Sequence, residues 1–268
     1  MRYVGTTVRG IRTPIIKEND NLVNIVVDSL MKAKESEKFE FKDCDVVAIT
    51  EAVVGISEGN YVTVDDIAKD VQNKFPNKDV GLVFPILSRN RFSMILKGIA
   101  RGMDHITMLI SFPSDEVGNG IMDEEKLNNS SYHLGSTITE REYENTFGDW
   151  LHPFTGINMI HYYKDLAEKE NCKIDFILAN DPKVILDYNK NVLACDIHTR
   201  FKTVKVLKEN GANVYSLTDV MSSPINGSGF NPKYGLLGSN KSTEERLKLF
   251  PKTGDKVVND IANKLKDL

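Results

Sequence analysis

Two aspartates lie where strand-like segments are expected to end, and their carboxylates could bind a divalent cation. Asp115 follows a run over 104–112, and Asp196 lies near the end of a run over 191–197. Mg²⁺ and Mn²⁺ prefer oxygen ligands, and ligand sites gather at the carboxyl ends of strands in α/β folds. The alternative is structural: Asp115 caps a turn, and Asp196 caps the helix that follows it. The spacing leaves both interpretations open.

Basic residues near two expected helix starts could bind phosphate or a substrate carboxylate. Arg200 lies four residues after Asp196, and Arg89 and Arg91 stand near the start of another expected helix. A guanidinium fork and a helix N-terminus both suit oxyanions. His198 could act as an acid or base near neutral pH. The alternative in each case is a solvated or capping side chain.

A glycine-rich segment near the end of the chain partly matches a phosphate-binding P-loop. Gly235 lies six residues before Lys241, and Ser242 follows the lysine. Asn240 stands where a P-loop needs glycine, because the backbone there has positive φ. The preceding residues also do not read as a buried strand. The pattern favours a loop leading into a helix capped by Ser242 or Thr243, with a P-loop-like phosphotransferase as an alternative.

The elements that must position these residues alternate between short β-branched runs and amphipathic stretches, which predicts an α/β fold with mixed or mainly parallel sheets and flanking helices. Near the N-terminus, the expected elements are a covered strand over 44–54, a helix capped by Thr63 and running to about Phe75, and a β-α-β unit with strands at 80–87 and 104–112. Later elements are helices over 139–147, 156–170 and 198–210, strands over 173–180, 191–197 and 212–217, and two terminal helical stretches.

A polar connection from Ser114 to about Thr139 has little periodicity, and long connections of this kind are often functional. It is the candidate boundary between two sub-halves, 1–113 and 139–268, of one domain over 1–268.

Composition excludes several classes of protein. The chain has 268 residues, 41% hydrophobic and 27% charged, which is enough for one sizeable core or two small ones. Its 34 basic and 38 acidic residues give a net charge of −4, which argues against non-specific binding of nucleic acid or anionic lipid. Three cysteines without a C-x-x-C pair indicate neither a disulfide framework nor a zinc knuckle.

The N-terminus lacks the apolar region of a signal peptide, and no run is long enough to span a bilayer. We therefore expect a cytoplasmic protein with small-molecule substrates and without nucleic-acid or membrane partners. A homodimer is one conceivable assembly.

Particular strings carry a resemblance that spacing alone does not. The segments VRGIRTPIIKENDNLV and DVVAITEAVVGISEGNYVTVDDIA resemble N-terminal nucleotide-binding segments of the coenzyme F420-0:L-glutamate ligase (γ-glutamyl ligase) family. FPILSRNRFSMILKGIARG, SFPSDEVGN, NVLACDIHTR and PINGSGFNPKYGLLGSNK are similar to a longer bacterial branch of it. The resemblance covers essentially the whole chain.

The resemblance implies an F420 ligase-like α/β fold and a GTP-dependent ligase. Such an enzyme attaches L-glutamate to a carboxylate of a deazaflavin precursor through an acyl phosphate, and it uses Mg²⁺ or Mn²⁺ and K⁺. The acceptor, and GTP against ATP, stay open for this chain because a fold does not fix the substrate.

The resemblance also assigns roles residue by residue. Asp115 and Asp196 are the implied metal ligands, and Ile197 stands where the family has a metal-contact threonine. Arg200 belongs to a shared Asp-x-x-x-Arg string and is, with His198, a catalytic candidate. The implied or candidate nucleotide contacts are Pro14, Ile15, Ile16, Lys17, Glu51, Ala52, Asn119, Arg89 and Arg91.

Two departures bear on activity. Ile56 replaces a basic residue of the family, and a C-terminal glycine-rich segment of the family has no counterpart before Leu268. We therefore expect either the N-terminal part of a longer protein or a reduced homologue. The alternative function is a nucleotide-binding or assembly module of the same fold without ligase turnover.

Overall fold

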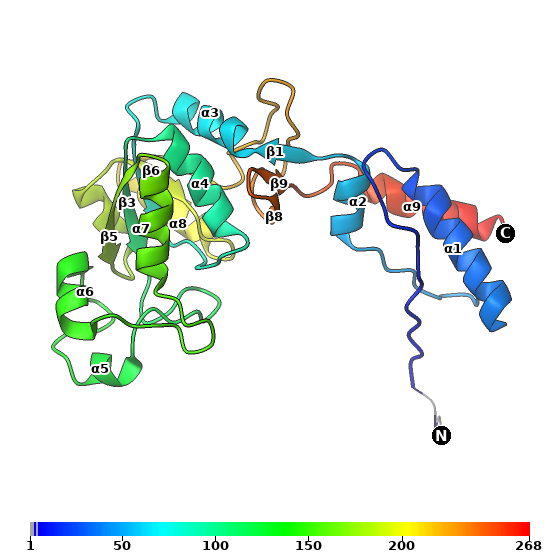
Figure 1. The fold of residues 1–268 in the computed structure, drawn as a ribbon, viewed down its shortest axis with the longest axis horizontal. Coiled ribbons are helices and arrows are strands. Elements are labelled where there is room, and N and C mark those ends of the chain that lie inside the picture. Colours follow the sequence, from blue (N-terminus) through cyan, green and yellow to red (C-terminus); the bar gives the residue numbers. More distant parts are fainter. Residues whose placement is uncertain (1–2, 4) are drawn as a thin grey trace. The chain divides into compact units, whose positions relative to one another are not determined.

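The computed structural model, which describes residue 3 and residues 5–268, divides into two compact units (Figure 1). The smaller unit contains the residues up to Asn60 together with Phe250–Leu268, and the larger unit is Tyr61–Leu249.

The larger unit is built on a six-stranded sheet with the order β4-β5-β3-β2-β6-β7. All neighbouring strands are parallel except β4, which pairs antiparallel with β5 at one edge. The expected α/β fold with a mixed, mostly parallel sheet is therefore confirmed. The strands are β2 (Asp79–Val83), β3 (His105–Ile110), β4 (Ile138–Thr139), β5 (Lys173–Leu178), β6 (Asn191–Ala194) and β7 (Asn213–Ser216).

The strands bury both faces of this sheet because successive side chains point to opposite sides. Leu82 and Met108 belong to one apolar cluster, while their neighbours Val83 and Leu109 belong to another. The helices that contribute to the first cluster are α3 (Val64–Lys74), α4 (Phe92–Gly102), α6 (Glu140–Phe147) and α7 (Met159–Lys169). The 3₁₀ helix η1 (Pro182–Asp187) and α8 (Arg200–Glu209) contribute to the second.

The strand order reverses between β2 and β6. From β2 the chain proceeds outward through β3 to β5, then crosses to β6 on the other side of β2 and proceeds outward to β7. In open α/β sheets, such a reversal leaves a crevice outside the carboxyl ends of the two central strands.

Helix α3 begins as its sequence predicts. The Thr63 hydroxyl accepts a hydrogen bond from Asp66 N, and the Asp66 carboxylate accepts one from Thr63 N. This capping box satisfies backbone groups that a helix start leaves free. Helix α4 packs closely against α3 because Gly102 has no side chain: a Cβ there would lie 2.6 Å from Ala68 O.

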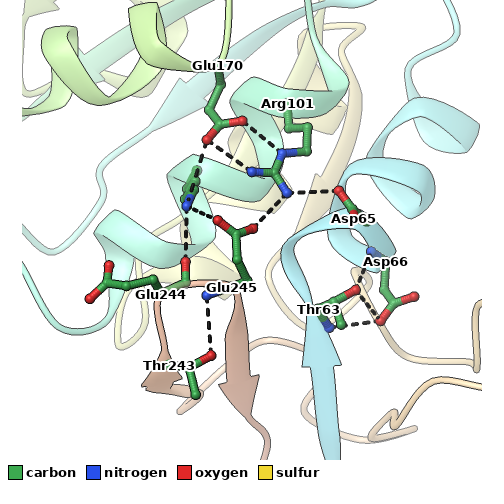
Figure 2. A network of polar contacts seen from close by, with 9 residues as sticks. Thr63, Asp65, Asp66, Arg101, Glu170, Thr243, Glu244 and Glu245 are labelled. Carbon is green, nitrogen blue, oxygen red and sulfur yellow. Dashed lines mark hydrogen bonds and ion pairs between the residues drawn. The ribbon is translucent and has the colours of Figure 1, made fainter.

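A network of ion pairs joins the elements around α4 (Figure 2). Arg101 donates to Glu170, which follows α7 directly, to Asp65 of α3 and to Glu245, at 2.8 Å each. The hydrogen bond to Glu170 is the main cause that raises the pKa of Arg101, so this guanidinium stays charged.

Glu245 lies in the turn of a hairpin formed by β8 (Asn240–Thr243) and β9 (Arg246–Lys248), and β9 also pairs antiparallel with β1 (Tyr61–Thr63). The helix expected after Ser242 or Thr243 is therefore wrong. The segment forms strands because β1 supplies a pairing partner and the cations of α4 bind the acidic turn.

The smaller unit contains α1 (Leu22–Glu37), α2 (Glu51–Ser57) and α9 (Gly254–Lys266). Leu22, Val54 and Ile261 belong to its core, one from each helix. The strand expected over 44–54 is wrong: Val46 is 88% exposed, and the helix α2 begins within the run. A short apolar run cannot by itself distinguish a strand from a helix, and here the helix buries Val54.

The unit boundaries also differ from the expected sub-halves, 1–113 and 139–268. The sheet takes β2 and β3 from the first and β5, β6 and β7 from the second. The polar connection between them, which contains the short helix α5 (Glu124–Asn128), therefore joins two parts of one sheet. The helices expected over 139–147, 156–170 and 198–210 are confirmed as α6, α7 and α8.

Candidate functional site

The loops that follow β2, β3 and β6 are held together at the carboxyl end of the sheet. Asp115, after β3, accepts a hydrogen bond from Leu87 N, after β2, at 2.8 Å. Glu116 accepts a hydrogen bond from Ile197 N, after β6, at 2.5 Å. Two adjacent acidic residues thus connect three strand ends around the point where the strand order reverses.

The Asp115 carboxylate is saturated with hydrogen bonds. Its Oδ1 accepts from Val117 N at 3.0 Å and Asn119 N at 2.9 Å. Its Oδ2 accepts from Leu87 N at 2.8 Å and from the Asn119 side-chain amide at 2.7 Å. A carboxylate offers about four lone-pair sites, and four donors occupy them here. Asp115 therefore organises its own turn, and Asn119, an implied nucleotide contact, uses its amide to support that turn.

Asp196 is fully buried and has one oxygen without a partner. Its Oδ2 accepts from the hydroxyls of Thr199 at 2.6 Å and Thr203 at 2.7 Å, while Oδ1 has no hydrogen bond. Burial raises the pKa of Asp196, the threonine bonds oppose this, and the nearby charge of Glu116 raises it further. A buried carboxylate oxygen without a partner can accept from a donor, or bind a cation, that comes from outside the chain.

Glu116 occupies a group of backbone donors at the start of α8. These donors, the N–H groups of Ile197, His198 and Thr199, are here named the amide cradle. Glu116 Oε1 accepts from Ile197, and Oε2 accepts from His198 at 3.0 Å and Thr199 at 3.3 Å. The sequence places Glu116 beside Asp115 at an expected strand end, but its role there was missed because a bond to backbone amides leaves no pattern of residue types.

A small cavity of about 50 Å³ lies where the strand order reverses. Ser239 is 2% exposed, and its Oγ has no hydrogen-bond partner. Burial raises the pKa of the Cys195 thiol well above its usual value, which makes it a poor nucleophile. The lining includes Ser88 after β2, Cys195 and Ile197 after β6, Leu217 after β7, and Ser239 from the glycine-rich segment.

The glycine-rich segment is not a P-loop. Gly235 has φ +52°, and a Cβ there would lie 2.4 Å from Val220 O and 2.6 Å from Leu217 O. This glycine therefore allows close packing against carbonyl oxygens, which repel phosphate. Lys241 lies in β8 and pairs with Glu244, and a strand stands where a P-loop requires a helix.

The three basic candidates, all arginines, lie just before α4 and in the first turn of α8. Arg89 and Arg91 are exposed before α4, and Arg91 Nε donates to the Asn240 side chain at 3.1 Å. Arg200 donates to Ile197 O, and its guanidinium carbon lies 4.3 Å from the centre of the Phe201 ring. Arg200 is thus close in the chain to the amide cradle, while its side chain is engaged with neighbouring groups.

The remaining candidates belong to the smaller unit. Pro14, Ile15, Ile16 and Lys17 precede a turn in which Lys17 N donates to Asp20, and Ile15 is 86% exposed. Glu51 and Ala52 are exposed residues at the start of α2, where a strand end was expected.

The donor set does not form a metal cage as it stands. In the described part of the chain, no three His, Cys, Asp or Glu side chains gather in a way that could hold a metal ion. Asp196 Oδ1 fits a cation, but Asp115 would first have to release backbone donors. The two implied metal ligands are therefore not equivalent.

Comparisons with known proteins give one family. A family model described as F420-0:Gamma-glutamyl ligase matches residues 10–268. Searches of curated proteins and of solved structures found no match. None of the helices in the described part of the chain is both long enough and apolar enough to cross a membrane.

Proposed function

The chain belongs to the F420-0:gamma-glutamyl ligase family, and from this premise we propose that it joins L-glutamate, or a similar amino acid, to a carboxylate acceptor with consumption of GTP. Membership implies a glutamate ligase activity on small-molecule substrates. The nucleotide, the acyl-phosphate route and the cations Mg²⁺ or Mn²⁺ and K⁺ are parts of the proposal. The acceptor class is a carboxylate; whether it is a deazaflavin stays open.

The observation that carries the proposal is the position of the amide cradle beside Asp196. Both follow β6 at the reversal of strand order, where α/β folds bind ligands. Backbone N–H groups at a helix start favour phosphate and other oxyanions. This arrangement supports phosphoryl and acyl transfer, which both pass through negatively charged oxygen.

The proposed reaction has two steps. The acceptor carboxylate attacks the γ-phosphorus of the nucleotide, so a new O–P bond forms and GDP leaves. The amino group of glutamate then attacks the acyl carbon; a C–N bond forms, inorganic phosphate leaves with the C–O electron pair, and the nitrogen loses a proton. Donors placed where negative charge develops stabilise both transition states. A bound divalent cation would neutralise phosphate charge, and Asp196 is the residue best placed to hold it.

The predicted nucleotide contacts at 14–17 and 51–52 stay predictions that rest on the resemblance. Those at Arg89 and Arg91 stay predictions that rest on their position before a helix. His198 and Arg200 stay catalytic candidates. His198 contributes its backbone N–H to the cradle, and its exposed imidazole follows Asp196 closely in sequence. Neither side chain needs to be invoked for the oxyanion contacts described above.

The test is acceptor-dependent product formation. The full chain is incubated with GTP, Mg²⁺ or Mn²⁺, K⁺, L-glutamate and candidate carboxylates, and phosphate release and amide products are measured. We expect Asp196→Asn to lower turnover on the order of a hundredfold, because it removes a buried charge beside the cradle. Asp187→Asn, an exposed aspartate at the end of η1, is the matched control and should keep activity.

Two outcomes would count against the proposal. Equal turnover by Asp196→Asn and the wild type would remove the role of Asp196. Nucleotide binding without any acceptor-dependent phosphate release would favour the alternative, a nucleotide-binding or assembly module without turnover, which the substitution at Ile56 motivates.

A further inference from the structure

We propose that Glu116 is an internal anion that occupies the amide cradle in the free protein and must leave when a phosphoryl oxyanion binds there. The identity of that oxyanion, a phosphoryl group of the nucleotide or acyl phosphate, rests on the proposed function. The competition itself rests on the contacts of Glu116. Glu116 is thus a regulator of access to the site rather than a catalytic residue.

The contacts of Glu116 have the geometry of a bound oxyanion. Both oxygens of Glu116 bind consecutive N–H groups at the start of α8, as two oxygens of a phosphate would. Glu116 reaches this position from the loop after β3, which is distant in sequence and tied to the loop after β2 through its neighbour Asp115. The cradle is therefore filled by a side chain from another loop, not by the local cap of its own helix.

A second carboxylate competes with Glu116 for one of the donors beside the cradle. The Thr199 hydroxyl lies 2.6 Å from Asp196 Oδ2 and 3.3 Å from Glu116 Oε2, but it has a single proton to donate. The shorter contact takes this proton, so Glu116 Oε2 lacks that bond while a buried carboxylate contacts the same hydroxyl. Two carboxylates that contact the same hydroxyl repel each other, which favours release of Glu116.

Two buried polar atoms near the cradle have no partner in the described part of the chain. Asp196 Oδ1 and Ser239 Oγ are buried without hydrogen-bond partners. Ser239 lines the same cavity as Ile197, whose N–H belongs to the cradle. A buried hydroxyl without a partner is unfavourable unless a ligand or water completes it. The Ser239 hydroxyl can donate to an oxyanion, whereas the Asp196 oxygen only accepts and needs a proton donor or a cation between it and that oxyanion.

The test uses inorganic phosphate as the probe and the full chain in the absence of acceptor and glutamate. Glu116→Ala and Glu116→Gln empty or neutralise the cradle. If Glu116 fills the cradle in about nine of ten molecules, its removal should strengthen apparent phosphate affinity roughly tenfold, because only the unfilled fraction can bind. Calorimetry measures the affinity. Amide NMR should show phosphate-dependent shifts and slower hydrogen exchange at Ile197, His198 and Thr199 in the variants.

The matched control is Glu124→Gln, which removes one negative charge from an exposed residue of the same connection. It should change phosphate affinity by less than about twofold, since screened surface charges act weakly at a distance. If Glu116→Gln folds with a wild-type melting temperature but binds phosphate no more tightly than the wild type, Glu116 is a structural cap and the proposal is overturned. Phosphate-induced shifts that avoid residues 197–199 would overturn it as well.

Ligation is measured separately, so the two ideas can fail independently. Tighter phosphate binding by Glu116→Ala together with absent ligase turnover would support the internal anion and reject the proposed reaction. Unchanged phosphate binding together with acceptor-dependent turnover would do the reverse.

Discussion

The Asp115 carboxylate accepts a hydrogen bond from Leu87 N at 2.8 Å and so ties the loop after β3 to the loop after β2. The same carboxylate also accepts from two backbone N–H groups of its own turn and from the Asn119 side chain. A residue whose family resemblance implies metal binding is therefore, in this chain, the organiser of a loop junction. This difference can be tested by stability measurements alone.

We expect Asp115→Asn to lower the free energy of unfolding by about 2–3 kcal/mol in the presence of a chelator. The asparagine amide would present a donor toward buried backbone donors, which would lose their acceptor. Urea denaturation measures the effect, and Glu125→Gln, an exposed acid of the same connection, should stay within about 0.5 kcal/mol of the wild type. A loss that occurs only when Mn²⁺ is added would show instead that Asp115 acts as a metal ligand.

The ion-pair network around Arg101 should stabilise the larger unit more than a surface pair does. Arg101 binds three carboxylates from three elements, and Glu170 is largely buried (Figure 2). We expect Arg101→Gln to lower the free energy of unfolding by about 1–2 kcal/mol, because Glu170 loses a charged partner in a poorly solvated place. Urea denaturation is again the measurement.

The control for Arg101 is Lys205, whose pair with Glu209 is exposed and 3.8 Å long. Lys205→Gln should change the free energy of unfolding by less than about 0.5 kcal/mol. Equal effects of the two substitutions would mean that the network adds nothing beyond ordinary surface pairs.

Sequence reasoning was reliable where local chemistry decides the structure. The capping box of α3 needs only Thr63 and Asp66, and the buried parallel strands are apolar runs of suitable length. It failed where a distant partner decides. Residues 240–248 become a hairpin because β1 pairs with β9 and because Lys97 and Arg101 bind its acidic turn.

Only part of the candidate site could be predicted from the sequence. Asp196 stands at the end of an apolar run, which places it at a strand end by pattern alone. The role of Glu116 was not predictable. Its partners are backbone amides more than 80 positions away, and such amides are the same whatever the residue type. The hydrogen bonds that saturate Asp115 depend on a turn geometry that spacing does not specify.

His105 provides a pH dependence at the opposite, amino end of the strands. Its ring nitrogens lie 2.9 Å from Asp79 and 2.9 Å from Asp175, and Lys173 also contacts Asp175. Burial alone would lower the pKa of His105, but the hydrogen bonds to Asp175 and Asp79 outweigh it, so the pKa is raised above 6.5. Only the protonated ring can donate to both carboxylates at once.

Because the folded-state pKa of His105 is raised, its contribution to stability is fully present below the unfolded pKa of about 6.5 and is lost as pH rises through the folded pKa. The wild type should therefore lose free energy of unfolding relative to His105→Gln as the pH rises above about 6.5, measured by urea denaturation at each pH. His133→Gln, an exposed histidine, is the control and should follow the wild type. Parallel pH curves for the wild type and His105→Gln would contradict the assignment.

Gly235 and Lys241 give a final prediction that separates packing from phosphate binding in the glycine-rich segment. Gly235→Ala should lower the free energy of unfolding by more than about 2 kcal/mol, because the new Cβ would meet carbonyl oxygens of residues 217, 218 and 220 at 2.4–2.6 Å. Gly118→Ala is the matched control: Gly118 also has positive φ, but open space surrounds its Cβ position, so only backbone strain of about 1 kcal/mol is expected.

Lys241→Ala should leave GTP affinity unchanged, since Lys241 pairs with Glu244 in a hairpin. A loss of GTP binding in Lys241→Ala, with normal stability in Gly235→Ala, would restore the P-loop interpretation.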